Sequence, residues 1–277
     1  MSKRWWPAVL LTAHCLLLIS LSLGCGGTVS PLRRYAVVGR DSYAIFTADG
    51  PDGTGDLFGT RGDGGPVFQI TFTAVREARP ALSPDGSMVA FLRSRSREDS
   101  LVGTPWIMNL LTGAERRVEL PAGMATEALG WSRDGRILYL NAGRFSYELP
   151  APPESGEARA VPPNQWHRVD SALGVFAGNP PFARIFPCET SLCAATDGGP
   201  PVSIADGGRD AARWGADSVG YFVGDKLLVR PNGPGRPRTL NWDRPPRRPR
   251  ELTAFAGVRA GSLPEPGAGG TGTDNPD

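Results

Sequence analysis

Cysteine spacing offers the most specific chemistry in this chain of 277 residues. Cys188 and Cys193 lie between two apolar stretches, and we expect these stretches to form a hairpin that places the two thiols opposite each other across a four-residue loop. A disulfide that closes so small a loop stabilises a fold by about 2 kcal/mol on the chain-entropy model. A metal site is the weaker alternative, because two thiolates alone do not complete a tetrahedral zinc site.

The N-terminus is typical of a secretory signal peptide. Lys3 and Arg4 are followed by an apolar run over residues 8–23, and the small residue Gly24 precedes Cys25. The sequence Leu-Ser-Leu-Gly-Cys that ends at Cys25 resembles a bacterial lipobox, which implies that this cysteine carries lipid as the first residue of the mature protein. Simple cleavage and an uncleaved anchor are the alternatives.

Lipidation at Cys25 would also explain an odd number of thiols. The chain has four cysteines, and Cys15 lies inside the apolar run that is removed with the signal peptide. Three remain, Cys25 and the pair Cys188 and Cys193, so that one thiol has no partner for a disulfide. The residue after Cys25 is Gly26 and not the aspartate that signals inner-membrane retention in lipoproteins. We therefore expect a lipid anchor in the bacterial cell envelope that faces the periplasm, with the outer membrane preferred over the inner.

Few residues have the arrangement that catalysis requires. Because His14 leaves with the signal peptide, His167 is the one histidine of the mature chain, which excludes a multi-histidine metal site. The sequence has no Gly-x-Ser-x-Gly elbow, no Gly-x-x-x-x-Gly-Lys phosphate loop and no dinucleotide fingerprint. We interpret His167 as structural and the Asp- and Gly-rich residues 49–56 as a turn, with calcium binding as the alternative. We expect no cofactor and no metal ion.

Charge argues against a nucleic-acid partner. The chain has 30 basic and 28 acidic residues, and removal of Lys3 and Arg4 leaves 28 of each sign. A neutral protein has no general attraction to nucleic acid. The Arg- and Pro-rich residues 244–250 are the one basic cluster, which we interpret as a stiff, solvated connector; binding to phosphate or to an aromatic groove is the alternative.

A turn motif recurs between apolar stretches and organises the rest of the chain. Leu82 precedes Ser-Pro-Asp-Gly, Trp131 precedes Ser-Arg-Asp-Gly, and an apolar strand follows each. Serine first, proline second and glycine fourth are favoured in a type I turn, because proline presets φ and glycine tolerates the left-handed exit. Each copy therefore predicts a β-hairpin. The residues that form the two turns are Ser83, Pro84, Asp85, Gly86, Ser132, Asp134 and Gly135.

Weaker copies of the motif give the chain a period. The five copies begin at positions 39, 83, 132, 177 and 215, so their spacings are 44, 49, 45 and 38 residues. A repeat of about 40–45 residues is the size of one four-stranded propeller blade. No segment of the mature chain shows a helical period. The sequence therefore predicts an all-β fold, a β-propeller with five recognisable four-stranded blades.

The repeats also set the expected domain boundaries. We expect a signal peptide over residues 1–24, a tether over 25–32, the propeller over 33–257 and a disordered Gly- and Pro-rich tail over 258–277. A propeller of this length is within the size of a single all-β domain. The pattern leaves open whether residues 250–256 close the ring as an extra strand or begin a sixth blade.

The copy at residues 79–91 resembles the repeat of TolB-like β-propellers, which are bacterial relatives of the WD-repeat proteins. The match is close in two copies and looser in three, where Ala177 and Gly215 replace the turn serine. The resemblance implies protein partners in the envelope and a monomeric binding or scaffolding module without enzymatic activity. The alternative is a propeller enzyme of the lactonase or lyase type, with an acidic or metal site at the central channel.

Overall fold

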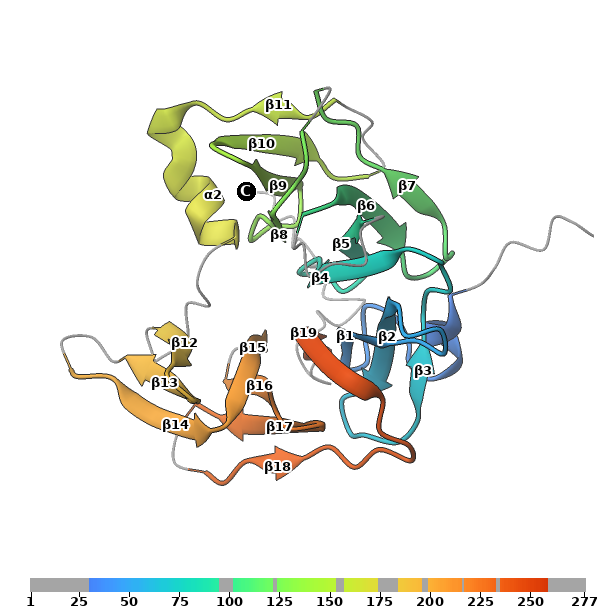
Figure 1. Cartoon of the computed structure of the whole chain (residues 1–277), viewed down its shortest axis with the longest axis vertical. Coiled ribbons are helices and arrows are strands. Elements are labelled where there is room, and N and C mark those ends of the chain that lie inside the picture. The colour runs from blue at the N-terminus through green and yellow to red at the C-terminus, as the bar shows by residue number, and fades with distance from the viewer. Residues whose placement is uncertain are drawn as a thin grey trace, which may run out of the picture.

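A computed structural model of the chain describes residues 30–94, 102–121, 124–152, 157–173, 184–195, 199–215, 217–232 and 235–258. These residues form five antiparallel sheets around a common centre (Figure 1). Strands dominate and the helices are short, so the predicted all-β propeller is confirmed. Cys25 and the turn predicted at position 177 lie outside the described residues.

Four of the sheets have four strands, and the sheet of β12 to β14 has three within the described residues. The first sheet contains, in hydrogen-bonding order, β19 (Arg247–Phe255), β1 (Tyr43–Asp49), β2 (Gly55–Arg61) and β3 (Val67–Gln69). The second contains β4 (Arg76–Leu82), β5 (Met88–Ser94), β6 (Thr104–Asn109) and β7 (Glu115–Arg117). The third contains β8 (Ala128–Trp131), β9 (Ile137–Ala142), β10 (Phe145–Pro150) and β11 (Arg159–Ala160). The remaining two contain β12 (Arg184–Cys188), β13 (Ser191–Ala195) and β14 (Val202–Asp206), then β15 (Gly208–Trp214), β16 (Ser218–Val223), β17 (Lys226–Pro231) and β18 (Arg238–Thr239).

The hydrophobic core lies between neighbouring sheets. Ala90 and Leu92 of β5 belong to one buried cluster with Leu138 and Leu140 of β9, which is in the next sheet. Strands β15, β19, β4 and β8 form the inner edges of their sheets and contact one another in that order (Figure 1). The ends of these inner strands therefore meet at the two mouths of the central channel.

The C-terminal strand β19 closes the ring. It pairs with β1 in antiparallel fashion, with Tyr43 opposite Phe255 and Asp49 opposite Arg247 (red beside blue in Figure 1). The segment is thus an extra strand of the first sheet and does not begin a sixth blade. The blade that begins with the first copy of the turn motif, near residue 39, therefore receives its inner strand from the C-terminal part of the chain.

Strand β19 also corrects the interpretation of residues 244–250 as a solvated connector. From Arg247 onward these residues are part of the sheet, and Pro249 is buried. Arg250 donates to Asp49 of β1, with 3.0 Å between Nη1 and Oδ1. Proline is accepted in an edge strand, and β19 pairs on one side alone, with β1. The Arg- and Pro-rich composition therefore did not indicate a strand, because the partner β1 lies about two hundred residues away in sequence.

A short helix also differs from the expectation that the mature chain has none. The 3₁₀ turn η2 (Pro163–Gln165) leads into α2 (Trp166–Leu173), while η1 (Pro31–Arg34) precedes β1. Val169 of α2 is 1% exposed and packs with Tyr139 and Val161. The apolar residues Trp166, Val169 and Leu173 do recur at helical spacing, but over only two turns, which is too short a run to identify a helix from sequence. His167 therefore lies on a helix.

Both strong copies of the turn motif form the same tight turn. The N–H of Gly86 donates to Ser83 O and that of Gly135 donates to Ser132 O, each at 2.9 Å. The serine Oγ in each turn donates to the aspartate two residues later. The two glycines have φ of +70° and +72°, in the left-handed region that glycine alone adopts without cost.

Candidate functional site

A cavity of about 1160 Å³ lies at one mouth of the central channel. Its wall is built from residues 82–84 after β4, residues 131–134 after β8, the end of β15 and residues 254–257 at the end of β19. Helix α2 completes the wall with His167, Arg168 and Ala172. The inner strands of four sheets thus converge on one space, and a concave space lined by both apolar and charged groups is the default binding-site hypothesis.

Basic side chains dominate the charged residues of this cavity. Arg133, Arg168 and Arg213 contribute guanidinium groups, whereas Asp134 is the one acidic residue in the described lining. Asp134 is engaged in its own turn, where Ser132 Oγ donates to it at 2.7 Å and lowers the pKa of its carboxyl. Arg168 also forms an ion pair with Glu148, which lies outside the lining, at 3.8 Å. The lining itself still holds more basic than acidic side chains, an arrangement that favours anionic groups.

The wall beneath the charged residues is apolar. Leu82, Ile137 and Phe255 line it together with Trp131, which is 8% exposed. The indole Nε1 of Trp131 donates to Ala81 O at 2.9 Å, so its ring is fixed against the neighbouring sheet. An apolar wall with basic groups suits a ligand that carries both apolar and acidic side chains.

Residues of the two tight turns line this cavity in addition to connecting the strands of their hairpins. Ser83, Pro84, Ser132 and Asp134 line it, although the sequence suggested only a structural role for them. The hydroxyls of Ser83 and Ser132 already take part in hydrogen bonds within the protein. Besides donating to an aspartate, each Oγ accepts a hydrogen bond from the N–H of Met88 or Ile137, at 2.9 Å. In the described residues no hydrogen bond joins His167 to a serine or a carboxylate, so no catalytic triad is assembled there.

A second, smaller pocket of about 400 Å³ lies near the starts of the inner strands. Asp49 there forms ion pairs with Arg248 and Arg250, at 3.6 and 3.0 Å. Asp52 accepts hydrogen bonds from the N–H and the hydroxyl of Thr54, at 3.0 and 2.8 Å. These carboxylates of residues 49–56 are therefore occupied within the protein. Among the described residues, no group of three or more His, Cys, Asp or Glu side chains is placed to hold a metal ion.

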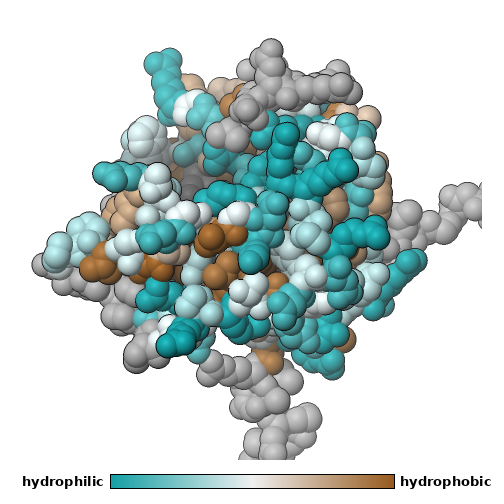
Figure 2. Space-filling model, turned by 60° about the horizontal axis from the view of Figure 1, so that its bottom comes forward, coloured by the Kyte–Doolittle hydropathy of each residue, from teal (hydrophilic) through white to brown (hydrophobic). Residues whose placement is uncertain are grey.

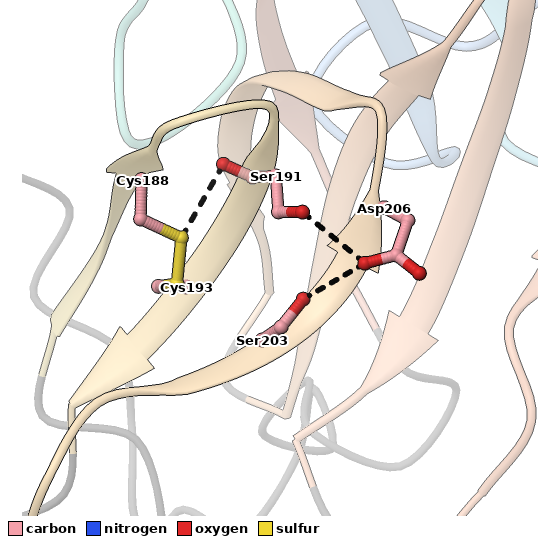
Figure 3. The surroundings of a disulfide bond; sticks show 5 residues. All are labelled: Cys188, Ser191, Cys193, Ser203 and Asp206. Atoms are coloured by element: carbon pink, nitrogen blue, oxygen red, sulfur yellow. Dashed lines mark hydrogen bonds between the residues drawn. A yellow bond between two sulfur atoms is a disulfide. The ribbon is translucent and has the colours of Figure 1, made fainter.

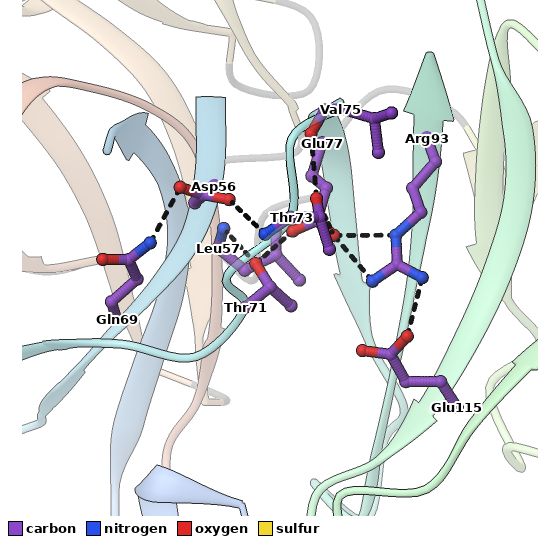
Figure 4. A network of polar contacts seen from close by, with 9 residues as sticks. All are labelled: Asp56, Leu57, Gln69, Thr71, Thr73, Val75, Glu77, Arg93 and Glu115. Carbon is purple, nitrogen blue, oxygen red and sulfur yellow. Dashed lines mark hydrogen bonds and ion pairs between the residues drawn. The ribbon is translucent and has the colours of Figure 1, made fainter. Parts of the chain in front are cut away.

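A buried polar network joins the first two sheets (Figure 4). Glu77 of β4 is 0% exposed and receives hydrogen bonds from Arg93, at 2.8 Å, and from the hydroxyls of Thr71 and Thr73. Arg93 also contacts Glu115 at 2.6 Å and lies over the ring of Trp106. No sequence motif predicts this network, because its members come from five strands and a loop.

Asp56 lies at the edge of the same network and is 2% exposed. Burial, with the nearby charge of Glu77, raises the pKa of its carboxyl to about 6. Burial likewise raises the pKa of Glu77, against the lowering effect of its hydrogen bonds and of Arg93. The ionised form of Asp56 is therefore disfavoured in the folded protein, and folding stability falls as pH rises from about 4 to about 6 and is then constant with respect to this group.

We predict that Asp56→Asn is more stable than wild type at pH 7.5, by about 1–2 kcal/mol once solvent screening is allowed for. The difference is smaller at pH 5, where Asp56 is protonated in the folded protein but still ionised in the unfolded chain, and it disappears below about pH 4. Urea unfolding followed by tryptophan fluorescence at both pH values measures this. Asp134→Asn is the control, because it leaves the wild-type pH dependence over this range in place; equal stability of Asp56→Asn and wild type at both pH values would contradict the prediction.

The structure pairs Cys188 with Cys193 in a disulfide at the β12–β13 hairpin (Figure 3). The hairpin is tighter than the predicted four-residue loop, because Cys188 lies opposite Ser191 and only Glu189 and Thr190 form the turn. The residue opposite Cys193 is Phe186. The disulfide therefore joins diagonal positions of the hairpin, with 5.8 Å between the two Cα atoms.

We expect this disulfide to form in the oxidising periplasm. Alkylation of the denatured, unreduced mature protein followed by mass spectrometry should leave Cys188 and Cys193 unmodified and linked. Reduction before alkylation is the control and should add two labels. Labelling of both thiols without reduction would show that the pair is reduced and would reopen a metal or redox role.

Comparison with solved structures agrees with the sheet arrangement. TolB from Acinetobacter baumannii is similar with a TM-score of 0.54 at 12% sequence identity, over 77% of this chain and 66% of that chain. A putative TolB from Agrobacterium tumefaciens has a TM-score of 0.46 at 15% identity, covering 74% and 90%. A chain of a nidogen/laminin complex has a TM-score of 0.49 at 9% identity, covering 78% and 100%.

These likenesses concern the fold. No family model matches the chain, and no curated protein matches it. The chain spans just under two thirds of the Acinetobacter TolB, and the identity is 12%. The arrangement of sheets is that of a TolB-like β-propeller, and function has to be argued from the cavity.

Proposed function

We propose that this TolB-like β-propeller is a non-enzymatic binding module that recognises an acidic segment of a protein partner in the cavity at the channel mouth. The observation that carries the proposal is the pairing of a basic lining with an apolar wall in a cavity of about 1160 Å³. Small-molecule pockets measure about 300–1,000 Å³, so this cavity has room for several residues of a peptide. Complementary charge would guide an acidic segment to it.

The absence of enzymatic activity is part of the proposal. Ser83 and Ser132 are held in their turns by both donated and accepted hydrogen bonds, which leaves neither poised as a nucleophile. The alternative is a propeller enzyme of the lactonase or lyase type with an acidic or metal site in the channel. It has less support, because Asp49 is neutralised by Arg248 and Arg250 near the other mouth.

We further propose a monomer that acts in the bacterial envelope, facing the periplasm, with lipid on Cys25 as its anchor and the outer membrane as its location. In the part of the chain that the structure describes, no helix is long and apolar enough to cross a bilayer. The face shown in Figure 2 is mostly hydrophilic, with apolar residues in small groups, so it offers no broad apolar surface for lipid. The proposed partners are envelope proteins and not nucleic acid.

Cys25→Ser is expected to release the protein from the membrane or to leave an uncleaved precursor. Two or three acyl chains hold a protein firmly, since each buried methylene contributes about 0.8 kcal/mol. Cells fed labelled palmitate should label a wild-type band of mature size and no band of the variant. If the wild-type protein takes up no label and its N-terminus maps elsewhere than Cys25, the lipid anchor is wrong and the chain is an ordinary secreted propeller.

Recovery of envelope proteins on the immobilised protein tests the binding site. Wild type is compared with the double variant Arg133→Glu and Arg213→Glu, which reverses two charges of the cavity. The matched control is Arg117→Glu with Arg159→Glu, on the outer strands β7 and β11. We expect a partner retained by wild type and control, lost about tenfold or more by the cavity variant and weakened by salt. Equal retention by all three proteins would overturn the cavity as the binding site.

A further inference from the structure

The chain leaves the propeller at the wall of the cavity. Strand β19 ends at Phe255, and residues 254–257 line the cavity. The N–H of Val258 then donates to Arg40 O at 2.8 Å, which fixes the backbone beside the turn that precedes β1. The segment of residues 259–277, the tail, therefore starts directly at the cavity and needs no linker to reach it.

The composition of the tail complements the cavity. Its acidic residues are Glu265, Asp274 and Asp277, and its one basic residue is Arg259. Leu263 lies between Arg259 and Glu265, next to a proline, and offers an apolar side chain for the apolar wall of the cavity. The described cavity lining has the opposite charge, with three arginines against one aspartate. The tail thus has the two properties that the cavity selects, an acidic character and a small apolar group.

The length of the tail also fits. A random-coil chain of 19 residues has an end-to-end distance of about 24 Å, which would be enough for the acidic residues of such a segment to reach the cavity at whose wall it begins. A tethered ligand of this kind experiences an effective concentration on the order of 1 mM. Even a weak interaction, with a dissociation constant of about 0.1 mM, would then keep the cavity occupied most of the time.

We propose that residues 259–277 bind in the cavity of their own molecule and compete with the partner segment. This inference rests on the proposed function, since it takes the cavity to be the binding site for acidic segments. The tail acts as an internal competitor: a partner has to displace it, and the partner's apparent affinity is its intrinsic affinity multiplied by the fraction of molecules in which the tail is unbound.

A labelled synthetic peptide of residues 259–277 tests the proposal by fluorescence anisotropy. The full chain is compared with a chain that ends at Val258, a deletion that removes none of the described helices and strands. We expect the peptide to bind the shortened chain and to bind the full chain about tenfold more weakly, because the tethered copy competes. A full chain with Glu265→Lys, Asp274→Lys and Asp277→Lys should bind the peptide as well as the shortened chain does.

Two further comparisons make the result specific. In the shortened chain, Arg133→Ala with Arg213→Ala should lose peptide binding, whereas the outer-strand pair Arg117→Ala with Arg159→Ala should keep it. An unrelated Gly-, Ser- and Glu-containing peptide of equal length and charge serves as a general acidic probe. Its binding reports on the cavity independently of the tail sequence.

The outcomes separate the inference from the function on which it rests. Equal binding of the tail peptide to the full and shortened chains, dependent on Arg133 and Arg213, would overturn tail occupancy and leave the acidic binding site in place. Binding of the unrelated acidic peptide without binding of the tail peptide would do the same. If neither peptide binds the shortened chain, tail occupancy and the acidic preference of the cavity are both wrong.

Discussion

Glu77→Ala is expected to destabilise the folded protein by about 3–5 kcal/mol, the usual cost of removing one partner of a buried ion pair. The side chain of Arg93 is only 11% exposed, and Glu77 supplies its contact at 2.8 Å within the sheet. Without that carboxylate, the guanidinium is left with Glu115, and the hydroxyl of Thr71 loses its acceptor. Urea unfolding at pH 7.5 measures the loss.

The control for this prediction is Glu119→Ala. Glu119 pairs with Arg117 at 3.5 Å, but both side chains are more than half exposed, so its removal should cost less than about 1 kcal/mol. Glu77→Gln separates charge from hydrogen bonding, since it keeps an acceptor for the threonines. A Glu77→Ala protein as stable as the Glu119→Ala protein would show that the network in Figure 4 does not hold the first two sheets together.

Gly86→Val is expected to cost about 3 kcal/mol or more, whereas Gly135→Val costs about 1–2 kcal/mol. Both glycines have positive φ, so valine is strained at either position. At Gly86 an added Cβ would also lie 2.7 Å from Tyr43 Oη and 2.8 Å from Phe255 Cγ. At Gly135 the nearest atom, Pro84 Cδ, is 3.3 Å away, which a small shift relieves.

Thermal and urea unfolding of the two valine variants measure the difference. Its origin is the closure of the ring, because Phe255 belongs to β19 and Tyr43 to its partner β1. Tyr43 also donates a hydrogen bond to Gly86 O, so the turn of the second sheet rests on the first. Equal destabilisation at Gly86 and Gly135 would mean that Phe255 of β19 and Tyr43 of β1 do not restrict the space at Gly86.

Residues with strong local preferences made the blades predictable from sequence. Ser83, Pro84 and Gly86 each favour one position of a type I turn, and their recurrence at Ser132 and Gly135 gave the period of the propeller. The disulfide was predictable as a pair, although its hairpin turn is shorter than expected.

Features that depend on distant partners were not predictable. β19 has a start rich in arginine and proline and becomes a strand through pairing with β1. The helical spacing of Trp166, Val169 and Leu173 in α2 extends over only two turns, which is too short a run to identify a helix from sequence, yet this helix adds Arg168 to the cavity. Arg133 and Arg213 come from copies of the motif that are far apart in sequence, and only the closed ring brings them to one mouth. The charge of the cavity could therefore not be read from the near-neutral composition.

The measurement that tests the central claim most directly is hydrogen exchange of the protein with and without the envelope partner recovered on it. Binding in the cavity predicts slower exchange in the segments around residues 131–137, 166–173, 213–215 and 254–257, which come from three sheets and α2. The outer strands β7, β11 and β18 should exchange at unchanged rates. Slower exchange confined to those outer strands, with the cavity segments unaffected, would contradict the assignment of the channel mouth as the binding site.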